Sequence, residues 1–527
     1  MNPDISRTQP TDIELNLTPE CEEAFSRVIG ERTGIVVQDS QLMFLRASVR
    51  DACRKFNYAS AQDYLSALQR CGETSRELEH LIADITVGES YFFRDAEQIQ
   101  YLSDVYLPAL IGRKRRARFQ MLRIWSAGCS MGQELYTIAI LLEELLPDID
   151  RWTIHLLGTD INTAALRQAV TGRYVQWSLR SVTAQKKSRY FKRPRGDDYE
   201  LLPRIRRRAR FIYQNLSEDN FPSILSETNA QDLILCRNVL MYMGSETVAS
   251  IMMKFAASLV PDGVLLLGAC DPHVGPIPGL IAKRSGNVHY YVPAAKTGNE
   301  STIAETTRPS TRARASPALR PSAGRTGLSL PARRVPRRET VTTATSSEEP
   351  LSDRQPGGPA YPNVKALLGD QRWSDAVRAI EDVVESEGES PFLLQLKAKA
   401  LANLGDLHEA VELCGLSQAG DPGDKHSYLI QAMALQGLNR LPEAETVLRK
   451  ALYLDHEFVE VHYQLALLLF VTGRMPAGLK SLENALQIAA RGDPERAIHD
   501  APGITYGRFV EILQNEFDIY SGLTDRK

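Results

Sequence analysis

The sequence of 527 residues is short of the features that mark secreted, metal-binding or membrane proteins. Its seven cysteines form no CxxC pair and show no metal-ligand spacing, which argues against a disulfide framework and a bound metal. Its apolar runs, such as Ile138–Leu142 and Val264–Leu267, fall well below the ~20 residues of a membrane span. Residues 1–17 are polar and lack the apolar core of a signal peptide. We therefore expect a cytoplasmic protein that does not insert into a membrane.

A strong charge of one sign is also missing. The formal net charge is −3, with 24% charged and 43% hydrophobic residues. These are ordinary values for a globular protein, and they predict no general attraction to nucleic acid. The length exceeds what one hydrophobic core supports, so several domains are expected.

The first part of the chain has a helical pattern. Thr18-Pro19 supplies a hydroxyl cap followed by proline, a typical helix start. Apolar residues then recur at three- and four-residue spacing, as in Leu42, Leu45, Val49 and Cys53. We predict a disordered N-terminus over 1–17 and an all-α domain over 18–95.

Short apolar segments alternate with helical patterns between residues 96 and 293. The segments expected to be strands are Met121–Trp125, Thr153–Gly158, Phe211–Tyr213, Asp232–Cys236, Val264–Leu267 and Val288–Val292. Strands that alternate with helices indicate a mainly parallel sheet covered on both faces. The sequence thus predicts an α/β, Rossmann-like domain.

Residues 294–360 have a different composition, rich in Pro, Ser, Thr and Arg. Such a segment buries too little apolar surface to offset its ordering entropy, so a disordered linker is expected. Its arginines could contact an acidic partner, although a solvated linker is the simpler interpretation. We expect residues 1–293 to fold and bind their ligand without the rest of the chain.

A small residue recurs every 34 residues in the C-terminal part, at Ala376, Ala410, Ala444 and Gly478. A turn residue recurs five positions earlier, at Gly405, Asn439 and Gly473. This period resembles tetratricopeptide repeats and predicts an all-α solenoid over 361–490, with a degraded unit near Gly369 and a helical tail over 491–527. Solenoids present a concave surface, so a protein partner is expected.

Two segments of the α/β domain indicate a nucleotide-like ligand. The small-residue loop Ser126–Gly132 follows a strand and precedes a helix, the place where doubly wound sheets bind such ligands. It lacks the GxGxxG spacing of a dinucleotide-binding enzyme. Asp160 ends the next strand and could accept both ribose hydroxyls of an adenosine; alternatively it caps the helix that follows.

Two other segments could supply the reacting site. Cys236–Tyr242 follows the fourth strand, where Asn238 could hydrogen-bond near the reacting centre and Tyr242 could offer a neutral hydroxyl to a carboxylate. Thr86–Asp95 places three consecutive aromatic residues, Tyr91, Phe92 and Phe93, between Ser90 and Arg94. This segment could line a site, or it could be a packing hinge with Arg94 paired to Asp95.

Four segments, ITVGESYFFRD, IWSAGCSMGQELYTIAI, GTDIN and LILCRNVLMYM, resemble in order and separation the bacterial chemotaxis receptor methyltransferases of the CheR type. The resemblance covers about residues 18–293. It implies a class I methyltransferase that uses S-adenosylmethionine, releases S-adenosylhomocysteine and methylates glutamate side chains of methyl-accepting chemotaxis-type receptors.

The resemblance also implies roles for individual residues. Arg94 and Tyr242 would face the acceptor, and Asp160 would hold the ribose. The residues expected at the cofactor are Gly88, Ser90, Arg94, Ala127, Gln133, Asp160, Asn215, Leu216, Arg237 and Asn238. The chain departs from the family at Gln133 and Leu135, where glutamate and proline are usual, and at Cys270-Asp271-Pro272, where the family has His-Ser-Glu.

Three alternatives stay open at this point. The methyltransferase fold could be a non-catalytic scaffold, although Arg94, Asp160, Asn238 and Tyr242 are all present. A small-molecule or RNA methyltransferase is disfavoured because the fourth strand is not followed by an NPPY-like motif. The basic run Arg204–Arg210 could be a solvated strand face or a docking site for an acidic receptor helix; the hairpin from Phe191 to Phe211 is short for gripping a receptor peptide.

Overall fold

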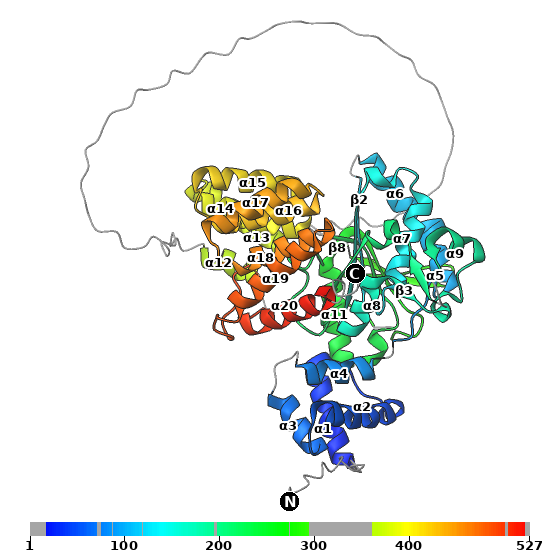
Figure 1. Ribbon diagram of the computed structural model, residues 1–527. Coiled ribbons are helices and arrows are strands. Elements are labelled where there is room, and N and C mark those ends of the chain that lie inside the picture. The colour runs from blue at the N-terminus through cyan, green and yellow to red at the C-terminus, as the bar shows by residue number, and fades with distance from the viewer. Residues whose placement is uncertain are drawn as a thin grey trace, which may run out of the picture. The chain divides into compact units, whose positions relative to one another are not determined.

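The protein is described by a computed structural model, shown in Figure 1. The described residues are 17–70, 75–86, 88–117, 120–193, 198–272, 275–294, 361–500 and 504–521. The segments predicted to be disordered, 1–17 and 294–360, lie almost wholly outside these ranges. Of the helices in the described ranges, none has both the length and the apolar character that a membrane span requires.

The N-terminal part is a small bundle of helices. The helices are α1 (Pro19–Thr33), α2 (Leu42–Phe56), α3 (Ala61–Arg70) and α4 (Arg76–Ile85). The Thr18 hydroxyl caps α1 by accepting from the backbone N–H of Cys21 at 3.3 Å, as the sequence predicts. Leu45, Val49 and Cys53 are buried on one face of α2 and pack in the core of the bundle.

A seven-stranded sheet follows, with strand order β6-β2-β1-β7-β8-β10-β9. The strands are β1 (Met121–Ala127), β2 (Thr153–Asp160), β6 (Ala209–Tyr213), β7 (Gln231–Cys236), β8 (Leu259–Leu267), β9 (Leu280–Ser285) and β10 (Val288–Pro293). β6, β2, β1, β7 and β8 run parallel, and β10 is antiparallel to β8 and β9. The strand order reverses direction at β1, and ligands bind at such a switch point, beyond the carboxyl ends of the strands.

Helices cover both faces of this sheet, as predicted. Successive strand residues enter two different cores: Ile124 and Leu156 face the core with α7 (Gln133–Leu145) and α8 (Thr163–Thr171), whereas Trp125 and Leu157 face the core with α11 (Ser245–Ser258). The helices α5 (Ala96–Tyr101) and α6 (Leu107–Arg116) belong to the first of these cores. This alternation is the two-residue period of a strand buried on both sides.

A separate three-stranded sheet, in the order β3-β5-β4, lies between β2 and β6 in the sequence. Its strands are β3 (Arg173–Tyr174), β4 (Phe191–Lys192) and β5 (Tyr199–Leu201), with α9 (Ala184–Tyr190) before β4 and α10 (Pro203–Arg206) after β5. The family resemblance implies a small β-subdomain in this region, whereas the residue pattern alone predicts only a hairpin, because strands of two or three residues have no visible period.

The C-terminal part consists of helix pairs. The helices are α12 (Tyr361–Gly369), α13 (Trp373–Glu387), α14 (Pro391–Leu404), α15 (Leu407–Gly420), α16 (Lys425–Gly437), α17 (Leu441–Leu454), α18 (Val459–Val471) and α19 (Met475–Ala489). Gln371, Gly405, Asn439 and Gly473 all have positive φ, which places the same left-handed turn in each of four units. Gly478 needs to be small, since a Cβ there would lie 2.4 Å from the Phe470 ring. The fourth, degraded unit therefore has the same helix–turn–helix form, with a shorter first helix of 9 residues and with Gln371 at the turn position.

The repeats also contact the α/β domain directly, which differs from the expectation that a linker alone joins them. His155 in β2 shares a hydrogen bond of 2.8 Å with the carbonyl of Gly437. Asn229 donates to the carbonyls of Ala402 and Asn403 at 3.0 and 3.1 Å. A last helix, α20 (Tyr506–Ser521), packs against both α19 and α8. Residues 1–293 therefore share a packing surface with the C-terminal part of the chain. That they fold and bind their ligand alone stays a prediction.

Candidate functional site

A cavity lies at the carboxyl ends of β1, β2, β6 and β7. Its walls come from the loop after each of these strands, from the segment between α4 and α5, and from the connection between α1 and α2. Most of the residues predicted for the site line it: Gly88, Ser90, Arg94, Asp160, Asn215, Leu216, Arg237, Asn238 and Tyr242. The four segments that carry the family resemblance thus converge on one cavity.

The loop after β1 approaches its neighbours closely. Gly128 has φ of 75°, and a Cβ at this position would lie 2.4 Å from Val239. Its N–H donates to the carbonyl of Thr159 at 2.8 Å, so the loops after β1 and β2 are joined. Only glycine fits here without strain. Cys129 is buried beside it, and burial raises the pKa of its thiol well above the usual value, which keeps it un-ionised.

Asp160 faces the cavity from the end of β2. Its Oδ2 accepts from the backbone N–H of Ser130 at 2.7 Å, and its Oδ1 accepts from the N–H of Asn162 at 2.8 Å. Burial raises the pKa of this carboxyl above its usual range. The cap of α8 is Asn162, whose Oδ1 accepts from the N–H of Ala165 at 3.0 Å. The alternative that Asp160 caps this helix is therefore wrong.

Two of the predicted cofactor residues, Ala127 and Gln133, do not line the cavity. Ala127 ends β1 and is fully buried in the core beside α11. Gln133 begins α7, is fully buried, and donates from Nε2 to the carbonyl of Ser90 at 3.4 Å. Their predicted contacts with a cofactor therefore lack support from the cavity lining, and Gln133 instead holds the segment that carries Ser90.

Arg237 forms three hydrogen bonds in the wall of the cavity. Its guanidinium donates to Gln98 Oε1 at 2.6 Å, to Glu134 Oε2 at 3.0 Å and to the carbonyl of Arg94 at 2.7 Å. The side chain is only 4% exposed. It therefore ties the end of β7 to α7 and fixes the backbone at Arg94. Glu134 and Gln98 were not predicted; Glu134 lies next to Gln133 in the motif, which is the only sequence signal for it.

Arg94 keeps its guanidinium toward the cavity. Nη1 donates to the carbonyl of Glu89 at 2.8 Å, and the group lies 5.8 Å from the centre of the Tyr91 ring. Arg94 does not pair with Asp95, whose carboxylate instead caps α5 by accepting from the N–H of Gln98 at 3.4 Å. The hinge alternative with an Arg94–Asp95 pair is therefore wrong in this detail.

The turn after β7 is held by Asp271, a residue whose role the sequence left open. Its carboxylate accepts from the N–H groups of Asn238, Val239 and Met241 at 2.6, 2.9 and 3.2 Å. Asn238 adopts φ of 60°, a strained conformation that these bonds stabilise. The residues Cys270-Asp271-Pro272, although they depart from the family, thus shape the cavity wall.

Tyr242 lies half-buried at the end of this turn. Burial raises the pKa of its phenol, and the positive charge of Arg94 partly offsets this effect. The phenol is therefore a neutral hydrogen-bond donor at physiological pH. A cation and a neutral hydroxyl face the same cavity, an arrangement suited to a carboxylate.

The basic run before β6 is largely paired within the molecule. Arg204 donates to Glu143 at 2.7 Å, Arg206 lies 3.7 Å from Glu200, and Arg208 donates to Asp150 at 3.3 Å. Arg210 pairs with Glu227. These ion pairs favour an internal structural role for the run over a receptor docking site.

The geometry defines a class of protein, the Rossmann-like S-adenosylmethionine-dependent methyltransferases. The cavity fits the cofactor because Asp160 can accept from ribose hydroxyls, and because the Ser130 hydroxyl, which lines the cavity, is buried with no hydrogen-bond partner among the described residues. Residues 88–274 match the family model described as CheR methyltransferase, SAM binding domain.

Chemotaxis protein methyltransferase 2 of Vibrio cholerae is 30% identical over 238 residues, which cover 45% of this chain and 80% of the relative. The chemotaxis protein methyltransferase of Borreliella burgdorferi is 26% identical over 289 residues, which cover 55% and 97%. The chain therefore belongs to the CheR family of chemotaxis protein methyltransferases, and its methyl donor is S-adenosylmethionine.

The C-terminal helices are similar to solved tetratricopeptide-repeat structures. A thermophilic TPR protein from Thermus thermophilus matches with 20% identity and a TM-score of 0.25, covering 32% of this chain and 91% of that structure. MamA from Desulfovibrio magneticus RS-1 matches with 19% identity and a TM-score of 0.24, covering 32% and 88%. The assignment of the repeats depends on the helix pairs and the 34-residue period described above.

Proposed function

We propose that this protein transfers a methyl group from S-adenosylmethionine to glutamate side chains of methyl-accepting chemotaxis-type receptors, forming glutamyl methyl esters in chemosensory adaptation. The observation that carries the proposal is that Arg94 and the protonated Tyr242 line the same cavity as Asp160. A guanidinium and a neutral hydroxyl suit a carboxylate acceptor. We also propose that the protein is cytoplasmic, as expected from its sequence.

Asp160 would accept the ribose hydroxyls of the donor, while Asn215 and Leu216 would frame its adenine. Gly88 and Ser90 would line the donor and acceptor site, and Arg237 and Asn238 would close the cavity from β7. Glu134 lines the same wall, but its carboxylate is paired with the guanidinium of Arg237 at 3.0 Å and accepts from the Ser126 hydroxyl at 2.8 Å. Its charge is therefore offset, and Glu134 does not replace the charge that a glutamate at position 133 would bring.

The donor supplies a methyl group on a positively charged sulfonium. A glutamate carboxylate has an unperturbed pKa of ~4.3 and is ionised at neutral pH, so no proton has to be removed and we assign no general base. The work of the protein is to orient the carboxylate and to exclude water. Well-oriented reactants can reach effective molarities of about 10⁵ M and more.

Arg94 would orient the acceptor more than it accelerates the chemistry. Charge on the carboxylate is neutralised as the methyl group moves, so a tight ion pair would stabilise the ground state more than the transition state. The guanidinium of Arg94 is already engaged by the carbonyl of Glu89 and the ring of Tyr91. This shared arrangement holds Arg94 in place and weakens any single ion pair with the acceptor.

The test uses the purified full-length protein, S-adenosylmethionine and cytoplasmic receptor fragments. Release of S-adenosylhomocysteine should depend on the fragment and should be lost when its acceptor glutamates are replaced by alanine. Release that is equal with and without those glutamates would contradict the proposal. The repeats, in this proposal, recruit or regulate through a protein partner.

A further inference from the structure

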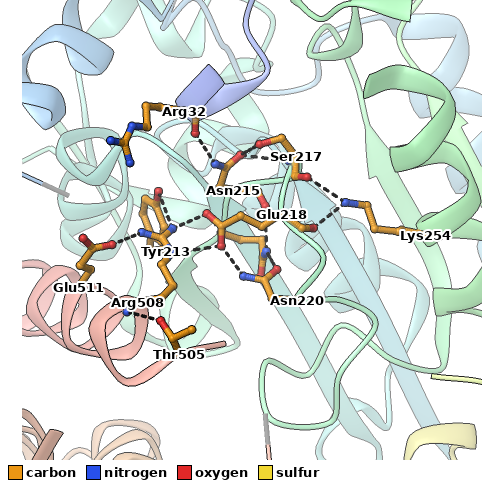
Figure 2. A network of polar contacts seen from close by, with 11 residues as sticks. Arg32, Tyr213, Asn215, Ser217, Glu218, Asn220, Lys254, Thr505, Arg508 and Glu511 are labelled. Carbon is orange, nitrogen blue, oxygen red and sulfur yellow. Dashed lines mark hydrogen bonds and ion pairs between the residues drawn. The ribbon is translucent and has the colours of Figure 1, made fainter. Parts of the chain in front are cut away.

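The loop 213–220 after β6 is a junction of three parts of the chain (Figure 2). Its residues Gln214, Asn215 and Leu216 line the cofactor cavity. Asn215 Nδ2 donates to the carbonyl of Arg32 at the end of α1, at 2.9 Å. Lys254 of α11 donates from Nζ to the carbonyls of Leu216 and Glu218 at 3.0 and 2.5 Å. The N-terminal bundle and the α/β domain therefore both hold this loop.

The third contact comes from α20, at the end of the chain. Arg508 Nε donates to Glu218 Oε2 at 3.2 Å, and its Nη2 donates both to Glu218 Oε1 and to the hydroxyl of Tyr213 at 3.2 Å (Figure 2). The Arg508 and Glu218 side chains are 10% and 18% exposed. Burial alone would lower the pKa of Arg508, but Tyr213 and Glu218 raise it well above its usual value. Arg508 Nη1 also pairs with Glu511 Oε2 at 2.7 Å within α20. Arg508 therefore makes a charged, two-point contact with Glu218 that is sheltered from water, and a further ion pair inside its own helix.

Hydrogen bonds continue from this pair to the cavity. Glu218 Oε2 accepts from Asn220 Nδ2 at 2.7 Å, and Asn220 Oδ1 accepts from Gln214 Nε2. The N–H of Gln214 donates to the carbonyl of Asp160 at 3.2 Å. Asn220 and Gln214 are buried, at 7% and 4% exposed. A continuous chain of bonded groups thus links Arg508 to the residue that we assign to the ribose.

The same helix also holds the strand that precedes the loop. The N–H of Tyr213 donates to Glu516 Oε1 at 3.2 Å, and the Tyr520 hydroxyl donates to the carbonyl of Phe211 at 3.2 Å. β6 is the edge strand of the sheet, and these bonds satisfy backbone groups on its side away from β2. Displacing α20 would therefore free both the strand and the loop.

We propose that Arg508 is a positioning residue for cofactor binding. Through Glu218 it holds the loop 213–220 in the arrangement that binds S-adenosylmethionine. Because Arg508 lies in α20, which packs against the repeats, the repeat domain sets the affinity for this donor. A partner that shifts α20 on binding the repeats lowers this affinity. By linkage, the bound cofactor strengthens the docking of α20. The inference concerns binding of the donor and does not depend on which carboxylate is methylated.

The experiment measures the dissociation constant of S-adenosylmethionine by calorimetry on the full-length chain, without receptor. Arg508→Gln and Glu218→Gln should each raise it about threefold to thirtyfold, the range for substitutions that couple to a site without touching its ligand. The double variant should have a dissociation constant no higher than the higher of the two single variants, because both substitutions break the same pair. Arg508→Lys should be intermediate, since it keeps the charge but loses the two-point contact. In turnover, the loss should appear in KM for the donor.

Lys399→Met is the matched control. Lys399 Nζ of α14 forms a similarly sheltered ion pair with Asp500, at 3.0 Å, in the segment between α19 and α20, and the described residues show no hydrogen bond or ion pair from either side chain to the loop. It should lower the thermal stability and leave the affinity for S-adenosylmethionine unchanged. If Arg508→Gln behaves like this control, with a lower melting temperature but an unchanged dissociation constant, the pair is only structural and the proposal is wrong. Additive losses in the double variant would also overturn the route through Glu218.

Discussion

The Asp160 carboxylate and the backbone N–H of Ser130 lie 2.7 Å apart, and this bond joins the end of β2 to the loop after β1. The second oxygen of Asp160 accepts from the N–H of Asn162 at 2.8 Å. An ionised carboxylate offers about four acceptor positions, so Asp160 can still accept from a ribose hydroxyl. The loops that form the cavity are thus organised around the side chain that we assign to the cofactor.

Asp160→Ala should weaken binding of S-adenosylmethionine. Hydrogen bonds to a charged group contribute about 1.5–3 kcal/mol, which corresponds to roughly tenfold to a hundredfold in affinity. Calorimetry measures this change directly. Asp150→Ala, which removes a carboxylate that is 94% exposed, serves as the control and should bind normally. An unchanged affinity in a correctly folded Asp160→Ala protein would refute the ribose assignment.

Arg94→Ala should reduce methyl transfer far more than stability. Loss of acceptor positioning can cost about a hundredfold in rate. The side chain makes one hydrogen bond, to the carbonyl of Glu89, so the melting temperature should fall by no more than about 2–4 °C. Arg180→Ala is the matched control, because Arg180 stacks 3.6 Å from the Tyr91 ring centre without lining the cavity. A strong loss of stability with normal turnover would make Arg94 a packing residue.

Asp271→Asn should loosen the turn after β7. The substitution removes one of two oxygens that together accept from Asn238, Val239 and Met241, and an unsatisfied buried donor costs about 1–3 kcal/mol. Thermal unfolding should show this loss, and turnover should fall because Asn238 and Tyr242 lie in the same turn. Cys270→Ser, at an exposed neighbour, should change neither quantity. If Asp271→Asn has the same melting temperature and the same turnover as the parent protein, the turn holds its shape without the carboxylate.

Glu516 should make the docking of α20 depend on pH. Burial raises the pKa of this carboxyl to about 7, with Arg210 and the N–H of Tyr213 acting in the opposite direction. The folded state therefore binds a proton that the unfolded state releases near pH 4.5, and stability should fall as pH rises from about 5 through 7. The full effect at pH 8 is at most about 3 kcal/mol. Glu516→Gln should flatten the dependence of melting temperature on pH over this range and raise the melting temperature at pH 8. If the variant and the parent protein have the same dependence on pH, Glu516 is ionised in the folded protein.

Much of the fold follows from local pattern. The hydroxyl of Thr18 caps α1, and the predicted strands match β1, β2, β6, β7, β8 and β10, because each is a short apolar run between turn residues. The two- and three-residue strands of the small sheet carry no such pattern. β9 was missed because its residues 281–284 are exposed and include Lys283 and Arg284.

The predicted site agrees with the cavity lining at residues that face the cavity directly, such as Asp160 and Tyr242. It was incomplete where a residue acts through others. Asp271 holds a turn 30 or more positions away in the chain, and Arg508 contacts Glu218 across 290 positions. No spacing rule relates such residues, because only the folded chain brings them together. The contact between α20 and β6 was missed for the same reason.

In the proposed function, carboxylates of receptors accept the methyl group in the cavity. The most direct measurement incubates the full-length protein with methyl-labelled S-adenosylmethionine and receptor cytoplasmic fragments, then maps the label by mass spectrometry before and after mild base. The account predicts label on glutamate side chains that mild base removes, and its loss with Arg94→Ala but not with Arg180→Ala. Label that resists base, or that lies on lysine, arginine or a nucleic acid, would contradict it.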